Sequence, residues 1–228
     1  MPRDLRDFGK NKQSWVILAL DYAPRADPLS EWRALIEKAM HLLAGVKLGL
    51  PAFLRIGPDG TKQLIEEFKG KLYFLADFKL ADIHEVVQEE LRLIENLGFD
   101  GAIIHLFPRC IEEPLHTQLE VFGLVSMSCK ESLVDHHLDE LSGYASKLGL
   151  KGVVVGATKP ESIKRVRKML QDAVILSPGV GVQGAAPGSA LAAGADFEII
   201  GRFVIYSVDP LSELEKVVRA QRLVRHEG

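Results

Sequence analysis

Cysteine is scarce in this 228-residue chain, and there is little excess of either charge. The two cysteines, Cys110 and Cys129, fit neither a disulfide framework nor a metal-ligand spacing, and we expect free thiols in a reducing compartment. Lysine and arginine number 28 against 31 aspartates and glutamates, a net charge of −3. General electrostatic binding to nucleic acid needs a basic excess, so no nucleic-acid partner is expected.

Long apolar runs are also missing. The hydrophobic runs fall below the roughly 18–20 residues that a membrane helix needs, so no association with a membrane is expected. Residues 1–14 are rich in charge and contain no apolar stretch, and we interpret them as an N-terminal tail rather than a signal peptide. With 47% hydrophobic and 26% charged residues, the composition is globular, and a cytoplasmic location is the expectation.

Short apolar runs recur along the chain, and amphipathic stretches lie between them. Near-continuous apolar runs are typical of parallel strands that are covered on both faces. The predicted strands are residues 15–20, 45–48, 72–76, 101–104, 119–125, 152–155, 173–176 and 197–200. Helical periodicity predicts helices at 29–43, 83–97, 137–148, 160–170 and 210–224, with short helices near 111–115 and 188–193.

Strand-then-helix units that recur eight times in about 230 residues predict a (β/α)8 TIM barrel. Because no linker or change in composition divides the chain, residues 15–228 are expected to form a single α/β domain. A doubly wound open sheet is the alternative architecture, but it usually has fewer strands. In a barrel of this kind the functional residues lie where strands end and βα loops begin, so polar residues at strand ends are candidates.

The densest charge signal follows the third predicted strand, where residues 77–83 read Asp-Phe-Lys-Leu-Ala-Asp-Ile. Asp77 and Lys79 are two residues apart, so on an extended strand they face the same side. The carboxylate keeps the lysine charged, whereas burial favours its neutral form. Such a lysine can donate a proton or stabilise a developing anion. An ion pair that caps the next helix is the alternative, but Asp21 and Lys47 at neighbouring strand ends favour a functional site.

A second signal comes from the loops after the last two strands. Residues 177–184 read Ser-Pro-Gly-Val-Gly-Val-Gln-Gly, and Gly201 and Arg202 follow the eighth strand. These two loops form the usual phosphate site of a barrel, where glycine N–H groups and an arginine can bind the anion. The first loop also contains G-x-G-x-x-G, but Pro187 and Gly188 delay the helix that a dinucleotide site requires. A flexible turn without a ligand is the remaining alternative.

Together these motifs resemble orotidine 5'-monophosphate decarboxylase, particularly its short microbial and archaeal form. The matching segments occur in order between residue 15 and about residue 206, and they are Ile-Leu-Ala-Leu-Asp at 17–21, Val-Lys-Leu-Gly at 46–49, the runs at 77–83 and 177–184, and Ile-Gly-Arg at 200–202. The resemblance implies a carboxy-lyase that converts orotidylate to uridylate and CO2 in pyrimidine synthesis. It also implies that the enzyme uses neither a metal nor an organic cofactor.

The resemblance also implies roles for individual residues. Lys79 would protonate carbon-6 of the pyrimidine, and Asp77 would lie against the departing carboxylate. Because the family forms homodimers with shared active sites, Asp82 and Ile83 would come from the partner subunit. The other implied substrate contacts are Asp21 and Lys47 to the ribose, Ser128 to the pyrimidine edge, Gln183 to base and phosphate, and Pro178, Gly201 and Arg202 in the phosphate loops. Val86 stands where the family often has a threonine, which removes one hydroxyl group.

Two other functions stay open at this point. The Asp-x-Lys-x-x-Asp run is shared with 3-hexulose-6-phosphate synthase and keto-gulonate-phosphate decarboxylase, which stabilise an enediolate with magnesium. A non-catalytic barrel that binds a phosphate ligand is the second alternative, although a binder would not need so costly a group of charges. The adjacent His136 and His137 do not face the same way on a helix, so no metal site is expected there.

Overall fold

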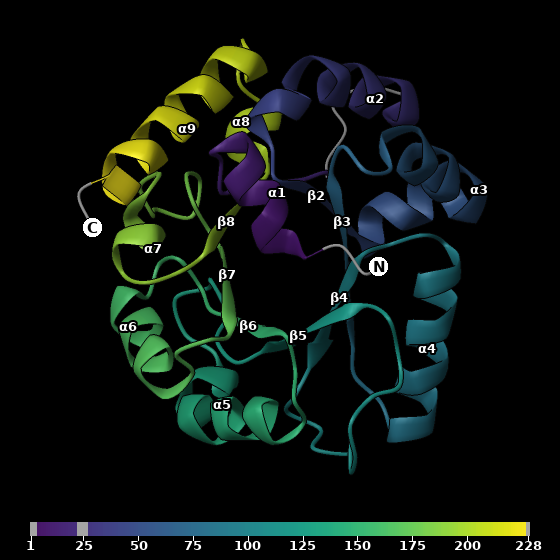
Figure 1. Ribbon diagram of the computed structural model, residues 1–228, viewed down its shortest axis with the longest axis vertical. Coiled ribbons are helices and arrows are strands. Elements are labelled where there is room, and N and C mark those ends of the chain that lie inside the picture. The colour runs from purple at the N-terminus through teal and green to yellow at the C-terminus, as the bar shows by residue number, and fades with distance from the viewer. Residues whose placement is uncertain (1–3, 22–26, 227–228) are drawn as a thin grey trace.

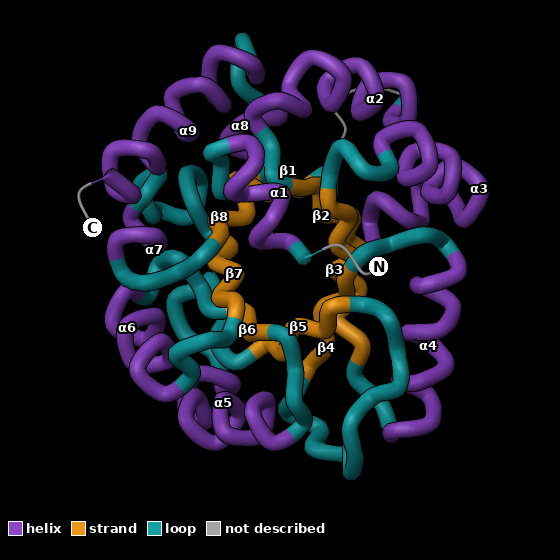
Figure 2. Tube along the Cα trace, viewed as in Figure 1, coloured by secondary structure: helices purple, strands orange, loops and turns teal. Residues whose placement is uncertain are grey.

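The computed structural model describes residues 4–21 and 27–226 of the chain. Within these residues, parallel strands close into a barrel in chain order, and the last strand pairs with the first (Figures 1 and 2). The strands are β1 (Val16–Ala19), β2 (Gly45–Gly49), β3 (Tyr73–Leu80), β4 (Gly101–His105), β5 (Glu120–Leu124), β6 (Gly152–Val154), β7 (Val174–Pro178) and β8 (Phe197–Ile200). The predicted (β/α)8 barrel is confirmed, and each predicted strand overlaps one of these.

Helices surround the strands on the outside of the barrel (Figure 2). They are α2 (Pro28–Ala39), α3 (Leu50–Phe68, with a kink at Gly57), α4 (His84–Asn96), α5 (Leu138–Lys147), α6 (Pro160–Met169), α7 (Ser189–Ala192), α8 (Arg202–Ile205) and α9 (Pro210–His226), with short 3-10 turns η1 (Met40–Leu42) and η2 (Leu133–His137). None of the helices in the described part of the chain has the length and apolar character that a bilayer span requires.

One predicted helix does not form. Residues 111–115 lie in the loop between β4 and β5 and have no helical turn. Pro114 within this segment cannot donate a backbone hydrogen bond. The Tyr144 hydroxyl instead bonds both the N–H and the carbonyl of Ile111, which fixes the loop against α5. The prediction at 111–115 was therefore wrong, whereas the short helix expected near 188–193 forms as α7.

The strands separate two apolar layers. In β1, Val16 and Leu18 pack outward in the larger cluster, which lies between strands and helices. Ile17 and Ala19 point inward and join the smaller cluster, which fills the barrel. This alternation follows from the two-residue period of a strand. It also places Lys47, in the middle of β2, on the inward face of the barrel wall.

The segment before β1 contains a helix that packs against the barrel. Residues 5–12 form helix α1 (Leu5–Lys12), in which Leu5 is fully buried and the Phe8 ring packs edge-on against Tyr73 at 6.1 Å. The Leu5 N–H donates to Glu120 Oε2 at 3.2 Å. Because Tyr73 and Glu120 begin their strands, α1 closes the amino-terminal end of the barrel, opposite the predicted site (Figure 1).

Candidate active site

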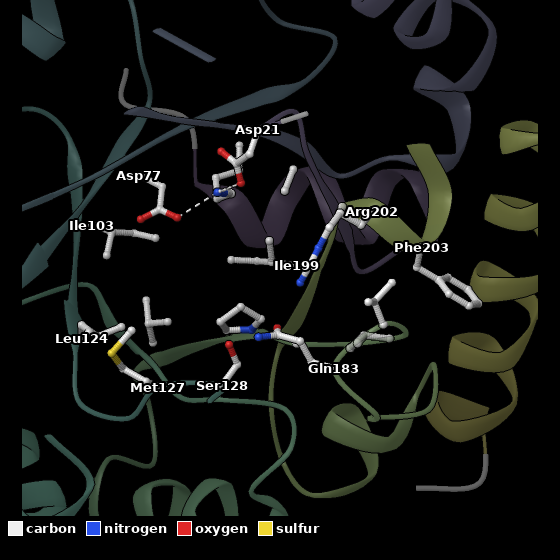
Figure 3. Close-up of a pocket in the computed structure, with 18 of the residues that line it drawn as sticks. Asp21, Asp77, Ile103, Leu124, Met127, Ser128, Gln183, Ile199, Arg202 and Phe203 are labelled. Carbon is white, nitrogen blue, oxygen red and sulfur yellow. Dashed lines mark hydrogen bonds and ion pairs between the residues drawn. The ribbon is translucent and has the colours of Figure 1, made fainter. Parts of the chain in front are cut away.

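Four charged side chains meet at the carboxyl ends of the first three strands. Lys47 in β2 donates from Nζ to Asp21 Oδ2 at 2.7 Å and to Asp77 Oδ2 at 2.9 Å. Lys79 donates from Nζ to Asp77 Oδ1 at 2.6 Å. We call Asp21, Lys47, Asp77 and Lys79 the charged array. Its charges alternate in sign, so each carboxylate lies against an ammonium group, and Asp21 and Asp77 lie at one end of the pocket (Figure 3).

Burial and pairing act in opposite directions on this array. Burial lowers the pKa of Lys47, but the facing carboxylates of Asp77 and Asp21 outweigh it and leave that pKa above its usual value. Burial likewise raises the pKa of Asp77, but Lys47 and Lys79 bring it below its usual value. Both groups are therefore ionised at neutral pH. The Lys79 side chain is 37% exposed, against 6% for Lys47, so Lys79 is the ammonium group that a ligand can reach.

Lys79 stands on an irregular stretch of β3. Its φ of 52° lies in the left-handed region, which is costly for a residue with a side chain. The pairing of β3 with β4 shifts register between Ala76 and Leu80, which indicates a bulge. Strain of this kind persists where the surrounding structure imposes it, often at functional sites. At Gly49 a Cβ atom would overlap the Asp21 carboxylate, so only glycine leaves room for the array.

A cavity of about 220 Å³ opens beside the array. Its floor is apolar and consists of inward-facing strand residues together with a loop residue, namely Ile103, Leu124, Val154, Ile199 and Met127. The end away from the array is formed by the loop after β7 and by the start of α8, with the lining residues Gly179, Val182, Gln183, Gly201, Arg202 and Phe203. Figure 3 shows Arg202, Gln183 and Ser128 on the side of the pocket away from Asp77.

The glycine loop after β7 brings two polar side chains together. Gly179 has a φ of 109°, and a Cβ atom there would come within 2.8 Å of Ser128 Cβ and 3.2 Å of Gln183 Oε1. Only glycine adopts this conformation and permits this approach. The loop therefore packs Ser128 and Gln183 side by side at the cavity (Figure 3).

All of the predicted site residues except two line this cavity; those that do are Asp21, Lys47, Asp77, Lys79, Ser128, Pro178, Gln183, Gly201 and Arg202. Asp82 and Ile83 are exposed and lie outside the cavity of their own chain. Asp82 Oδ1 accepts a hydrogen bond from the Ile83 N–H at 2.8 Å. A single chain thus brings together the array and the segments that follow β7 and β8, and leaves Asp82 and Ile83 at the surface.

The sequence prediction missed the apolar floor. A signal for it was available, because Ile103, Leu124, Val154 and Ile199 each lie near the carboxyl end of a predicted strand. Counting in steps of two along each strand would have placed these side chains on the inward face. Met127 had no such signal, since it belongs to a loop.

Comparisons with known proteins agree with this site. The "Orotidine 5'-phosphate decarboxylase / HUMPS family" matches residues 14–217. The orotidine 5'-phosphate decarboxylase of Aeropyrum pernix is 38% identical over 212 residues, which cover 89% of this chain and 86% of the relative. The crystal structure of the orotidine 5'-monophosphate decarboxylase from Metallosphaera sedula is 34% identical, with a TM-score of 0.76 and coverage of 92% of this chain and 99% of that one. That from Methanocaldococcus jannaschii, complexed with inhibitor BMP, shares the fold at 24% identity, with a TM-score of 0.79 and coverage of 91% and 98%. The chain therefore belongs to the orotidine 5'-phosphate decarboxylase family.

Proposed function

We propose that this chain converts orotidine 5'-monophosphate to uridine 5'-monophosphate and CO2. The observation that carries the proposal is the pairing of Lys79 with Asp77 at 2.6 Å beside a cavity whose other end carries phosphate-type loops. A pyrimidine nucleotide has a matching layout, with a reacting carboxylate at one end and a phosphate at the other. Neither a metal ion nor an organic cofactor takes part in the proposed reaction.

The polar groups of the cavity suit the three parts of such a nucleotide. Backbone N–H groups of the glycine loop and the Arg202 guanidinium suit the phosphate, and Ser128 and Gln183 suit the base. Asp21 Oδ1 is buried and accepts no hydrogen bond from any described residue. A buried acceptor of this kind calls for a donor. A ribose hydroxyl would supply it, next to Lys47.

In the proposed reaction, the bond between carbon-6 and the carboxyl carbon breaks and the electron pair remains on carbon-6. Lys79 donates a proton from Nζ to that carbon, and then regains a proton from solvent. Asp77 holds the Lys79 ammonium group in place through its Oδ1. Because Asp77 is also held by Lys47, it cannot turn away from an arriving carboxylate without losing an ion pair.

The electrostatic magnitudes indicate which residue contributes most. Repulsion between Asp77 and a substrate carboxylate at about 4 Å amounts to roughly 4 kcal/mol at an effective dielectric constant near 20. Enzymes generally lower barriers by about 8–23 kcal/mol. Repulsion alone is therefore insufficient, and the larger share falls to Lys79, whose charge stabilises the carbanion as it forms. Binding of the distant phosphate supplies the free energy that holds the substrate against Asp77.

The proposed active unit is a homodimer in which each site is completed by the partner. Asp82 and Ile83 stand exposed at the start of α4, and Ile83 is 51% exposed although it is apolar. A neighbouring subunit would cover Ile83 and bring Asp82 close to the array of the other chain. Isologous contacts of this kind are the commonest in homodimers.

A subunit-mixing experiment tests the shared site. Lys79→Ala and Asp82→Ala chains should each be inactive alone. After they are unfolded and refolded together, about a quarter of the sites should carry both native residues, because half the dimers are mixed and each has one intact site. Recovery of about a quarter of native turnover is the expected result, and no recovery would show that each chain builds its own site.

The reaction itself is tested by the loss of orotidylate ultraviolet absorbance with purified protein, with and without EDTA. We expect full activity in EDTA, whereas a magnesium-dependent relative would lose it. We also expect the Lys79→Ala variant to fold but to leave the orotidylate absorbance unchanged. No loss of orotidylate with the native chain would overturn the proposed function.

We also place the enzyme in the cytoplasm. Cys110 and Cys129 are both free and exposed, which suits a reducing compartment. Fractionation of source cells, with activity recovered in the soluble cytoplasmic fraction, is the expected result.

A further inference from the structure

The loop that carries Ser128 is held in place from outside the cavity by the carboxylate of Asp135, which belongs to no sequence motif. Ser126 donates from Oγ to Asp135 Oδ1 at 2.6 Å, and the Met127 N–H donates to the same oxygen at 3.3 Å. The other oxygen, Asp135 Oδ2, accepts from Lys159 Nζ. One carboxylate of η2 therefore ties the end of β5 to the loop before α6.

We propose that Asp135, fixed by Lys159, is a positioning residue that orients Ser128 for recognition of the pyrimidine base. This inference rests on the proposed function, because it assigns a residue that controls which base the site accepts. Asp135 and Lys159 do not line the cavity, whereas Met127 and Ser128 do. Asp135 acts through the backbone of residues 126–128 and not by touching a ligand.

The opposite side of this loop is also fixed. Thr158 donates from Oγ1 to the Ser128 carbonyl at 3.1 Å, and the glycine at 179 lets the loop after β7 pack against the Ser128 side chain. These contacts hold the backbone and leave the Ser128 hydroxyl pointing toward the pocket beside Gln183 (Figure 3). Two loops and a 3-10 turn thus set the position of one hydroxyl group.

Burial makes the Asp135 contacts costly to lose. The Ser126 side chain is fully buried, and Asp135 and Lys159 are 20% and 16% exposed. Without the carboxylate, the Ser126 hydroxyl and the Met127 N–H lose their acceptor, and the loop can recover it only by moving. Although burial works to raise it, the pKa of Asp135 is held below its usual value by the hydrogen bonds of Lys159 and Ser126, so the carboxylate is charged at neutral pH.

The test compares two ligands that differ only in the base. Uridine 5'-phosphate needs Ser128, whereas ribose 5-phosphate has no base to contact it. For Asp135→Ala we expect calorimetry to show a roughly 10- to 100-fold weaker affinity for uridine 5'-phosphate, with that for ribose 5-phosphate unchanged within about twofold. The KM for orotidylate should rise by a similar factor.

Three further variants separate positioning from general damage. Lys159→Arg keeps the ion pair and should behave as the native chain, and Lys159→Met should reproduce a smaller loss of the same base-dependent kind. Asp139→Asn is the matched control, because Asp139 is an exposed residue of α5 that pairs with Arg165 and, among the described residues, has no hydrogen bond to the loop that carries Ser128. Both affinities of this variant should be native. If Asp135→Ala does not fold, Asp135→Asn and Lys159→Met carry the test.

An equal loss of affinity for both ligands, or native affinity for uridine 5'-phosphate in the Asp135 and Lys159→Met variants, would overturn the inference. These outcomes differ from a failure of the proposed function, in which the native chain itself would not consume orotidylate.

Discussion

Lys47 and Lys79 both pair with Asp77, yet replacing each by methionine should affect folding and turnover in opposite ways. Lys47 is 6% exposed and bonds two carboxylates, at 2.7 and 2.9 Å. Lys79 is 37% exposed and bonds one carboxylate, which keeps Lys47 as a second partner. We therefore expect Lys47→Met to damage mainly stability, and Lys79→Met to damage mainly catalysis.

The stability difference follows from burial. Lys47→Met leaves Asp21 and Asp77 without the cation between them, and breaking a buried pair in this way costs about 3–5 kcal/mol. At roughly 2–4 °C per kcal/mol for a chain of this size, the melting temperature should fall by about 6–20 °C. Lys79→Met breaks a partly exposed pair, for which about 0–1 kcal/mol is typical, so the melting temperature should change by at most about 4 °C.

For turnover the order of the two variants is reversed, and Lys79→Met should lose more activity than Lys47→Met. Loss of a general acid typically costs about 10²- to 10⁴-fold, and loss of an electrostatic donor costs a further 10²- to 10³-fold or so. Because Lys79 is proposed to do both, kcat of Lys79→Met should fall by at least about 10⁴-fold. Lys47→Met keeps that ammonium group, and its kcat/KM should fall less when measured well below its melting temperature.

Circular dichroism melting and the orotidylate absorbance assay measure the two effects. Lys164→Met is the control, since Lys164 pairs with Glu161 on an exposed face of α6 and should change neither property. The reasoning is refuted if the melting temperature falls by about 6 °C or more in Lys79→Met but not in Lys47→Met. It is also refuted if Lys79→Met retains more than about 0.01% of native kcat, because loss of the two proposed roles should together lower kcat by at least about 10⁴-fold.

Three shorter predictions concern other parts of the chain. Arg202→Ala should weaken the binding of uridine 5'-phosphate by roughly 10- to 100-fold and leave the affinity for uridine unchanged. An equal loss of affinity for both ligands, measured by calorimetry, would contradict a role of Arg202 in phosphate binding. Gly49→Ala places a Cβ where the Asp21 carboxylate lies, so the KM for orotidylate should rise, and a native KM would contradict that overlap. Burial lowers the pKa of Lys12 to about 8, so between pH 8 and its usual value the unfolded chain binds more protons than the folded one. The stability of the native chain relative to Lys12→Met, from urea unfolding, should therefore rise from pH 8 to pH 10; a constant difference would contradict the shift.

The sequence was sufficient to predict the strands and the array because both depend on local pattern. A parallel strand covered on both faces must be apolar throughout, so the runs that became β1 to β8 were visible. The two-residue period then predicted that Asp77 and Lys79 share a face, and they bond at 2.6 Å. Their shared face survives the bulge in β3, which the sequence could not indicate because Lys79 is not a residue that favours a positive φ.

The features that escaped prediction all depend on contacts between distant residues. Helix α1 has few apolar residues, and its burial becomes apparent only when Leu5 and Phe8 meet the barrel interior. Asp135 in η2 pairs with Lys159 in a loop 24 positions along the chain, and no periodicity or motif links the two residues. The role of Asp82 depends on a contact between chains, because the site that it is proposed to complete belongs to a second subunit.

The charged array also shows why the two ends of the cavity depend on each other. With two aspartates and two lysines it is neutral as a whole, which makes it tolerable beside an apolar floor. A substrate carboxylate would give this end a net negative charge, and the array has no further ammonium group to offset it. The opposing free energy must come from outside the array, and we propose that the loop after β7 and Arg202 supply it by binding the phosphate. In the proposed reaction, the catalytic effect of Lys79 is therefore limited by the phosphate affinity of Arg202, although the two residues act on opposite ends of the ligand.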